Sequence, residues 1–163
     1  MRIYTGLKDK KLSFSKKFGA THLINSKRRN PVSEIKKITN GRGVDYAFDM
    51  VGKTETQNFA LLSTKEGIPG YEIGGSIILT GFPREKLELN TRDVVMGQKT
   101  IIGSRGGGVI PKIHFPKFYT DIIKGKLLLK QVVTNVFKLD QISLALKLLK
   151  TGKILGRAII RIS

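Results

Sequence analysis

The sequence has no cysteine and no tryptophan, and it has only two histidines among 163 residues. The absence of cysteine excludes a disulfide framework, a thiolate zinc site and a cysteine nucleophile within this chain. His22 and His114 lie far apart in the sequence, and neither has a potential ligand residue close by. We therefore expect no metal site and no catalytic residue in this chain.

Long hydrophobic runs are missing as well. No apolar segment approaches the length of a membrane span, and the first eleven residues, MRIYTGLKDKK, lack the apolar stretch of a signal peptide. With 40% hydrophobic and 26% charged residues, a chain of this length is expected to form one globular domain with a core. The expectation is a cytoplasmic protein that does not contact membranes.

Acidic residues are scarce, since 12 of them face 30 lysines and arginines, which gives a formal net charge of +18. This excess fits a protein that binds nucleic acid or another anionic surface. It also fits a chain whose lysines simply cover solvated helix faces. We favour the second interpretation, because the basic residues are scattered and no binding motif accompanies the short cluster at residues 27–29. Any nucleic-acid binding is expected to be non-specific.

The most informative stretch is residues 41–83, in which short apolar runs alternate with glycines. Residues 44–50 form a β-prone run that stops at Gly52, and residues 76–79 form a second that ends at Gly81. A helix is predicted over residues 54–66 between them, with Thr54 and Gln57 spaced as a capping box. This order of strand, glycine, helix, strand and glycine is typical of a parallel sheet, in which ligands lie beyond the carboxyl ends of the strands. Gly52 and Gly81 are therefore expected to lie at the same edge of the sheet, where a ligand would bind.

The remaining elements follow from apolar patterns and from start and stop residues. Asn30 and Pro31 have the residue types of an N-cap and a first helical position, and Asp140 is predicted to cap the last helix. Further strands are predicted at residues 2–5, 22–25, 99–103, 134–139 and 156–162. Further helices are predicted at residues 8–18, 31–40, 93–97, 116–124 and 140–151, with Phe118, Ile122 and Ile123 facing inward.

These pieces, in this order, resemble the C-terminal part of the zinc-type medium-chain alcohol dehydrogenases. The runs that carry the resemblance are KLSFSKKFGATHLIN, GRGVDYAFDMVG, GGSIILTGFP, IIGSRGGG and ALKLLKTGKILGRAII. Together they span essentially the whole chain. The class that acts on S-(hydroxymethyl)glutathione and the general alcohol dehydrogenases look alike in these runs, so both subgroups stay open.

The resemblance implies an α/β fold, namely an incomplete Rossmann-like doubly wound parallel sheet. Its first strand and the G-x-G-x-x-G turn are missing, and the GSRGGG run follows a late strand without that glycine spacing. Residues 1–163 would form a partial dinucleotide-binding domain with the family's C-terminal tail, without the catalytic zinc domain. The chain then looks like a fragment or split half of an NAD(P)-dependent alcohol dehydrogenase, inactive alone. Zinc would belong to the missing domain.

The same resemblance implies which residues contact the cofactor. Gly6 stands where NAD-specific members place an aspartate, so NADP is indicated, although a turn glycine before a solvated helix explains Gly6 equally well. Lys8 and Lys11 could attract the 2′-phosphate. Binding of either NAD or NADP is expected to be weak or lost. The other implied contacts are Met50, Val51, Gly52, Thr80, Gly81, Phe82, Ser104, Arg105, Gly106 and Arg157.

Partners follow from the missing strand, because strands that lose a neighbour expose edges that recruit other chains. The expected partners are an N-terminal half or a full-length dehydrogenase subunit, together with self-association. A non-catalytic interaction module and a basic nucleic-acid binder are the alternative functions. Asp49 ends a strand with no visible partner, and a catalytic carboxylate pair with Asp45 is improbable.

Overall fold

The computed structural model describes residues 1–83 and 85–162, and its elements alternate between strands and helices. The strands are β1 (Ile3–Gly6), β2 (His22–Asn25), β3 (Tyr46–Asp49), β4 (Ser76–Leu79), β5 (Thr100–Gly103), β6 (Val133–Lys138) and β7 (Arg157–Arg161). The helices are α1 (Asp9–Ser15), α2 (Pro31–Ile38), α3 (Thr54–Ser63), α4 (Thr91–Met96), α5 (Pro111–Ile123), α6 (Leu129–Val132) and α7 (Ile142–Lys150). None of the helices in the described residues has the length and apolar composition needed to cross a bilayer.

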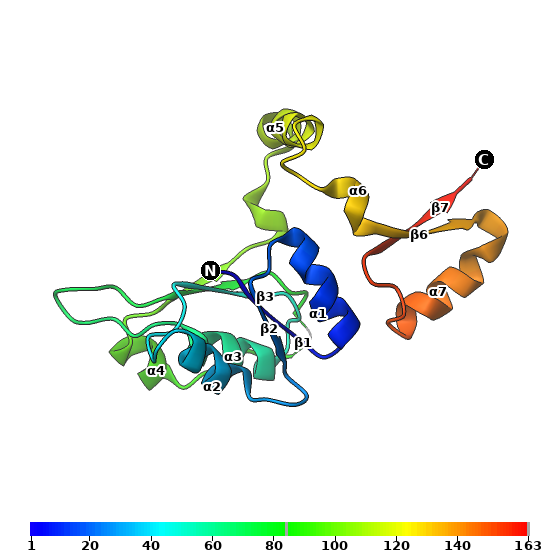
Figure 1. Ribbon diagram of the computed structural model, residues 1–163. Helices are drawn as coiled ribbons and strands as arrows, with labels where there is room; N and C mark the ends of the chain where they lie inside the picture. The colour runs from blue at the N-terminus through cyan, green and yellow to red at the C-terminus, as the bar shows by residue number, and fades with distance from the viewer. Residues whose placement is uncertain (84, 163) are drawn as a thin grey trace.

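The strands form three parallel sheets, β1–β2, β3–β4–β5 and β6–β7. Parallel neighbours need a crossover connection, and α1, α3, α4 and α7 provide those connections here. The predicted α/β class with a Rossmann-like parallel arrangement is therefore confirmed. In Figure 1, α2, α3 and α4 lie together on one side of the strands, and β6, α7 and β7 form a separate C-terminal unit.

Two strand edges are open in the middle of this arrangement. β1 pairs with β2 alone and β3 pairs with β4 alone, and no backbone hydrogen bond joins β1 to β3 within the described residues. Helix α2 contacts both β2 and α3, so it links the first two sheets through packing. β1 and β3 thus remain edges and do not pair directly with each other.

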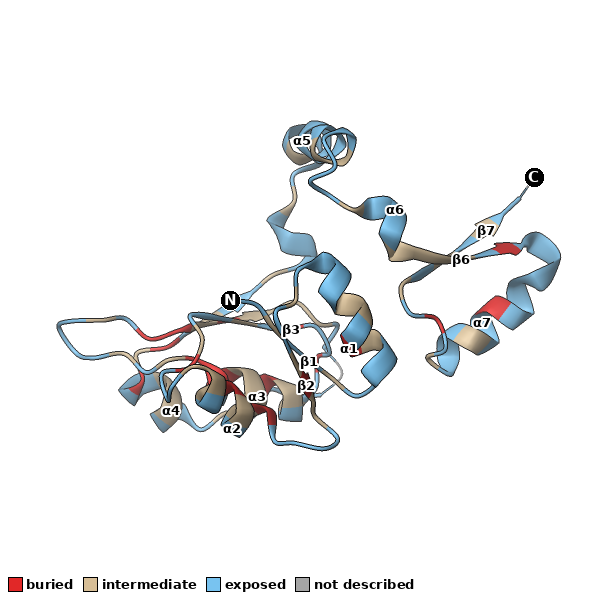
Figure 2. Cartoon of the chain, in the orientation of Figure 1, coloured by how far each residue is buried: buried red, intermediate tan, exposed pale blue. Residues whose placement is uncertain are grey.

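The buried core is small and divided among these units. Leu12 and Ile24 are buried between α1 and β2, while Leu61 and Ile77 are completely enclosed where α3 covers β4. The C-terminal unit has its own cluster, formed by Phe137, Ala145 and Ile154. Figure 2 shows these buried positions as short red segments in a chain that is mostly intermediate or exposed.

Several boundaries follow the local sequence signals closely. β2 and β4 have the predicted bounds, and α2 begins at Pro31 as expected. The Asn30 carboxamide oxygen accepts hydrogen bonds from the backbone N–H groups of Val32 (2.9 Å) and Ser33 (3.2 Å), which satisfies two free donors of the helix. Gly19 ends the first helical segment with a left-handed φ of 87°, a conformation that favours glycine.

The predicted capping box at the start of α3 is wrong. Thr54 is already helical and Lys53 is the N-cap, without a side-chain cap. The Glu85 carboxylate instead accepts a hydrogen bond from the Thr54 N–H (3.0 Å), and the Thr54 hydroxyl donates to the carbonyl oxygen of Lys86. A carboxylate from a later loop therefore replaces the local cap. The helix also ends at Ser63, because Thr64 is extended and bridges to Val44.

Two predictions in the C-terminal part are also wrong. Helix α5 begins at Pro111, and Pro116 lies inside it. Its apolar side chains do not face inward as expected, since Phe118 is 36% and Ile123 69% exposed. At the start of the last helix, Asp140 makes no capping bond, and the Gln141 side chain accepts the backbone N–H of Lys138 instead.

Buried lysines hold the carboxyl end of α3. The Lys99 side chain is fully buried, and its ammonium donates to the Leu61 carbonyl oxygen (3.0 Å) and pairs with Glu66 (2.7 Å). The Lys36 ammonium donates to the Thr64 carbonyl oxygen nearby. Burial lowers the pKa of Lys36, and the adjacent positive charge of Lys99 lowers it further. Cations at this position complement the negative end of the helix dipole.

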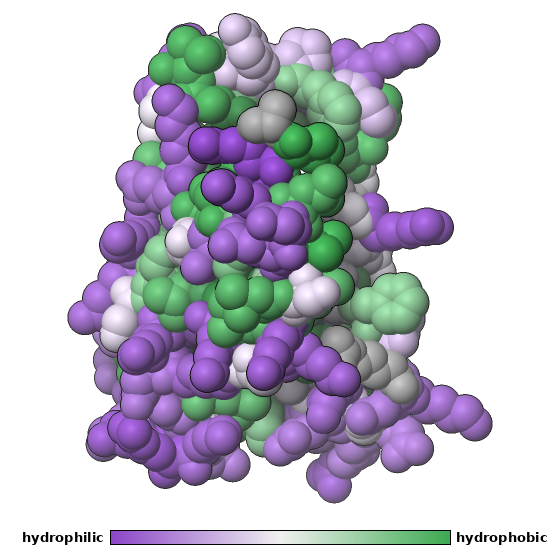
Figure 3. All heavy atoms as spheres, turned by 90° about the vertical axis from the view of Figure 1, so that its right-hand side faces the viewer, coloured by the Kyte–Doolittle hydropathy of each residue, from purple (hydrophilic) through white to green (hydrophobic). Residues whose placement is uncertain are grey.

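One face of the three-stranded sheet is uncovered. Phe48, Ile78 and Ile102 occupy the same register row, and Phe48 is 59% and Ile102 43% exposed. Tyr46 lies on the same face of β3. A second apolar surface belongs to α7, where Ile142, Leu146 and Leu149 are all exposed. Figure 3 views the molecule from the C-terminal side and shows apolar side chains bordered by hydrophilic ones.

We predict that the chain self-associates through the uncovered face of the three-stranded sheet. Parallel strands are normally buried on both faces, so the apolar row of β3 gains by contact with another chain. Replacing Phe48 with lysine should therefore raise the fraction of monomer in sedimentation velocity experiments. Added salt should increase association of the unmodified chain, because it screens the repulsion between strongly cationic copies.

The matched control is Tyr71→Lys, since Tyr71 is 86% exposed in a loop outside this face. This change should leave the sedimentation profile close to that of the unmodified chain. A monodisperse monomer with a sharp thermal transition, for both the unmodified chain and Phe48→Lys, would contradict the prediction.

Candidate functional site

Asp49 organises the carboxyl ends of β3 and β4. Its backbone carbonyl oxygen accepts hydrogen bonds from the N–H groups of Thr80 (2.9 Å) and Gly81 (2.8 Å) and from the Thr80 hydroxyl (2.9 Å). Its buried carboxylate accepts from the N–H groups of Val51 (3.1 Å) and Gly52 (2.9 Å) and from the Thr56 hydroxyl (2.8 Å). The sequence shows no partner for Asp49, whereas the structure gives its carboxylate three, namely two loop amides and the Thr56 hydroxyl.

Gly52 and Gly81 let the two strand-end turns lie against each other. A side chain on Gly52 would overlap the carbonyl oxygen of Phe82, and the φ of Gly52 is +79°. A side chain on Gly81 would come within 2.6 Å of the Val51 nitrogen. Both positions therefore require glycine, as the sequence suggested, and the close approach is between two stretches of this chain's own backbone.

The side chains around these turns face solvent. Met50 is 68%, Val51 45% and Phe82 83% exposed, whereas the Thr80 hydroxyl is held by Asp49. The structure thus brings together the predicted residues of β3 and β4 in one surface of exposed apolar side chains and fixed backbone. We call this surface, residues 50–52 and 80–82, the rim. A flat ring could lie on such a surface.

Ser104 extends the rim to the next strand. Its backbone N–H donates to the carbonyl oxygen of Leu79 (2.9 Å), so it lies beside the end of β4. Arg105 and Gly106 follow in an exposed turn, in which Gly106 has a φ of +63°. These three residues share the carboxyl edge of the sheet with the rim.

The predicted residues near β1 belong to a different sheet. Gly6 is the last residue of β1, and a Cβ there would lie 3.5 Å from the Leu12 side chain and 3.6 Å from that of Tyr4, which is ordinary contact. Glycine is therefore not required by space at this position. The Lys8 ammonium donates to the carbonyl oxygens of Thr151 and Gly152, both at 3.1 Å. Lys11 is partly buried on α1.

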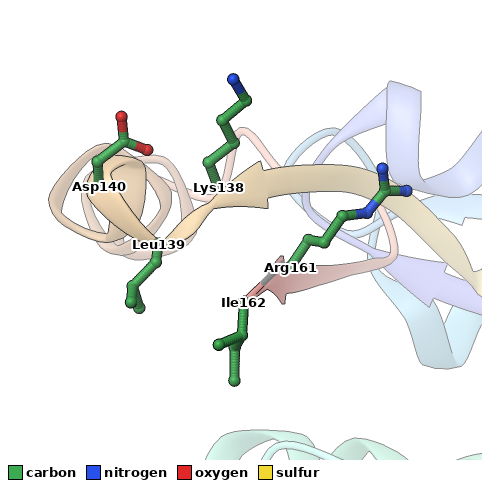
Figure 4. A pocket seen from close by; sticks show the side chains of 5 residues that line it. All are labelled: Lys138, Leu139, Asp140, Arg161 and Ile162. Atoms are coloured by element: carbon green, nitrogen blue, oxygen red, sulfur yellow. The ribbon is translucent and has the colours of Figure 1, made fainter.

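Arg157 lies outside both the rim and the β1–β2 sheet. It begins β7, where it pairs in register with Val133, and so lies in the C-terminal sheet. That sheet also carries an open hollow of about 700 Å³, lined by Lys138, Leu139, Asp140, Arg161 and Ile162. In Figure 4, Lys138 and Arg161 point to one side of the strands while Leu139 and Ile162 point to the other. None of these five residues belongs to the rim.

The histidines are engaged in local hydrogen bonds. His22 Nδ1 lies 2.9 Å from the Thr21 hydroxyl, and His114 Nδ1 lies 2.9 Å from the backbone nitrogen of Ile110. Throughout residues 1–83 and 85–162 there is no group of three or more histidine, aspartate or glutamate side chains that could hold a metal ion. The described side chains at the rim therefore offer no ligand set for zinc.

A family profile described as zinc-binding dehydrogenase matches residues 3–124 of the sequence. The chain belongs to this family. Two relatives from Arabidopsis thaliana, alcohol dehydrogenase-like 3 and alcohol dehydrogenase-like 5, are 35% and 33% identical over 156 and 151 residues. These alignments cover 94% and 90% of this chain but only 38% and 37% of the two relatives, respectively.

Solved structures of alcohol dehydrogenases have the same fold. Benzyl alcohol dehydrogenase from Acinetobacter calcoaceticus superposes with a TM-score of 0.85 at 30% identity, over 99% of this chain and 42% of that protein. The alcohol dehydrogenase of Aeropyrum pernix gives a TM-score of 0.78 at 28% identity, over 97% of this chain and 42% of that protein. The chain thus corresponds to about two fifths of these relatives.

We predict that Asp49→Ala destabilises the fold by about 2 to 3 kcal/mol, because it removes a buried charged acceptor and leaves two loop N–H groups unpaired. Asp45→Ala is the control. Asp45 is an exposed acid on the same strand run that pairs with Arg42, so its loss should cost less than about 1 kcal/mol. Urea unfolding followed by circular dichroism measures both, and equal effects of the two substitutions would contradict the role of Asp49.

Proposed function

We propose that this chain is the nucleotide-binding part of an NAD(P)-dependent alcohol dehydrogenase and that it has no dehydrogenase activity by itself. The observation that carries the proposal is the rim, where residues 50–52 and 80–82 meet beside Ser104 at one carboxyl edge of a parallel sheet. In open α/β sheets this edge is where ligands bind. Membership of the zinc-binding dehydrogenase family supports the choice of a nicotinamide dinucleotide as that ligand.

The rim would hold the nicotinamide half of the cofactor. Backbone fixed by Asp49 provides a rigid surface, and the exposed Met50, Val51 and Phe82 side chains offer apolar contact to a ring. Ser104, Arg105 and Gly106 would contact the carboxamide, and Arg157 would pair with the pyrophosphate. The bound cofactor supplies the hydride acceptor, whereas these residues supply only position and orientation.

The helix next to the rim, α3, offers the pyrophosphate a poor site, which supports weak binding. Phosphates favour the free N–H groups at a helix N-terminus. Next to the rim, one of the free N–H groups at the start of α3 already has a partner, because the Glu85 carboxylate accepts the Thr54 N–H. A carboxylate at this position also repels a phosphate. We therefore expect the adenosine and nicotinamide halves to contribute most of the affinity.

A second function, as a non-catalytic interaction module, is favoured by a separate observation. β1 and β3 each have one hydrogen-bonded neighbour, and the apolar row containing Phe48 is exposed. Strands with open edges add further strands through their backbone groups. A dehydrogenase subunit or an N-terminal half of such an enzyme would be the partner, and a stable complex without any cofactor binding would favour this function over the first.

We predict that the chain binds NADP at least as well as NAD, because Gly6 provides no carboxylate to repel a 2′-phosphate. Gly6→Asp should fit sterically, since a Cβ there makes only ordinary contacts. This change should shift the ratio of the two affinities toward NAD by about tenfold, which corresponds to about 1.4 kcal/mol. Isothermal titration calorimetry with both cofactors provides the measurement. A micromolar NAD site that discriminates strongly against NADP in the unmodified chain would disprove the prediction.

We also predict no alcohol oxidation by the purified chain with NAD or NADP, even after zinc is added. The chain has no cysteine, and its described residues contain no cluster that could hold zinc near a substrate. The assay follows nicotinamide absorbance with several primary and secondary alcohols. A heat-treated sample of the same chain is the control, and turnover well above that control would rule out the proposal that catalysis needs residues outside this chain.

A further inference from the structure

Lys138 and Arg161 lie side by side at the carboxyl ends of β6 and β7. The two strands are parallel, and these two residues are partners in register. Like charges at directly opposite positions of neighbouring strands destabilise the pairing. Within residues 1–83 and 85–162, neither side chain forms an ion pair with an acid. We call these two residues the cationic pair, and an anion between them would relieve their repulsion.

An apolar row precedes the cationic pair on the same face of the sheet. Phe137 and Ile160 pack into the core of the C-terminal unit, which α7 helps to form. Because successive side chains of a strand point to opposite faces, Val136, Ile159 and the cationic pair lie on the other face. Val136 and Ile159 are partners in register and are 51% and 45% exposed. The cationic pair follows them about 7 Å further along the strands.

An open hollow beside the cationic pair provides room for a small ligand. Its volume of about 700 Å³ is within the usual range for such sites, and Lys138, Asp140 and Arg161 contribute its charged groups. In Figure 4 the Asp140 carboxylate lies on the same side of the strands as the Lys138 ammonium. A fixed carboxylate near the site repels further negative charge, so a monoanion fits here better than a dianion.

We propose that this face binds a carboxylate that carries an aliphatic or aromatic body. The Arg161 guanidinium and the Lys138 ammonium donate to the carboxylate oxygens, since a guanidinium matches the planar geometry of a carboxylate. The body of the ligand lies over the apolar row and removes part of Val136 and Ile159 from water. An inorganic anion gains only the first of these two contributions.

The site is separate from the contacts proposed for the nucleotide. Arg157 begins β7, whereas Arg161 ends it, and an extended strand places the two about 13 Å apart. A small carboxylate bound at the cationic pair therefore does not reach Arg157. None of the rim residues belongs to this sheet either. The inference goes beyond the proposed function and does not depend on it.

Hexanoate is the probe, because its length matches the spacing between the cationic pair and the apolar row. Saturation-transfer difference NMR with the unmodified chain measures its binding. The dissociation constant should be about one millimolar, which is ordinary for so small a ligand on an open face. Hexanol, which lacks the charge, should bind at least about threefold more weakly. Inorganic phosphate, which lacks the apolar body, should not displace hexanoate at equal concentration.

Substitutions locate the site. Lys138→Met and Arg161→Met should each weaken hexanoate binding by about threefold or more, because each removes one of the two cations. The matched control is Lys150→Met, which removes an exposed lysine of α7 and should leave the affinity unchanged. The thermal midpoints of the first two variants should stay the same or rise, since the repulsion between like charges is removed. Loss of binding is thereby distinguished from loss of the fold.

Asp140→Asn tests the preference for a monoanion. This change removes the nearby negative charge, so phosphate should now compete with hexanoate, while hexanoate itself should bind at least as well as before. Phosphate that remains unable to compete in this variant would show that Asp140 does not set the preference, and this part of the inference would be wrong.

The other outcomes decide the site as a whole. Equal hexanoate affinity in the unmodified chain, Lys138→Met and Arg161→Met would place the ligand elsewhere and overturn the inference. Equal binding of hexanol, or displacement of hexanoate by phosphate from the unmodified chain, would overturn the assigned ligand class. The absence of saturation transfer at millimolar hexanoate would overturn the site itself. No measurement involves a nicotinamide cofactor, so each result is independent of the proposed function.

Discussion

The buried carboxylate of Asp49 is the interaction on which the candidate site depends. Asp49 accepts six hydrogen bonds, three at its carboxylate and three at its backbone carbonyl oxygen, and together they fix both strand-end turns. The glycines at positions 52 and 81 are necessary because these bonds pull two stretches of backbone together without room for a Cβ. The exposed apolar side chains of the rim are then displayed on a fixed support. Rigidity here comes from polar bonds more than from a large apolar core.

Much of the fold follows from signals within a few residues of each other. β2 and β4 have their predicted bounds because short β-branched runs end at turn residues, and α2 begins where asparagine precedes proline. The two glycines of the rim were also identified, since a glycine that ends each strand is a local feature. Gly6 ends β1 and Ser104 follows the end of β5, so both lie at carboxyl ends of strands, although in two different sheets.

Local sequence patterns do not reveal a hydrogen-bond partner that is distant along the chain. The Glu85 carboxylate, 31 residues from Thr54, accepts the N–H group that the expected capping box would have left to a local side chain. No residue near Thr54 in the sequence indicates this partner. The prediction that Lys8 attracts a phosphate stays a prediction, but the sequence does not show that its ammonium bonds carbonyl oxygens 143 and 144 residues further on. The inward face expected for α5 was wrong for a related reason. Its apolar spacing is helical, but Phe118 and Ile123 remain exposed among the described residues.

The exposed apolar surfaces and the positive charge act in opposite directions on association. Apolar contact favours a second copy of the chain, while a net charge of +18 on each copy opposes it. The two effects differ in range, since apolar contact requires touching surfaces and charge repulsion extends over about 8 Å at physiological ionic strength. A partner with acidic residues around an apolar patch would gain from both effects together. The residues after Asp93 carry only two negative side chains, Asp121 and Asp140. Charge repulsion between two copies is therefore strongest where the surfaces of α5 and α7 would meet the same surfaces of the second copy.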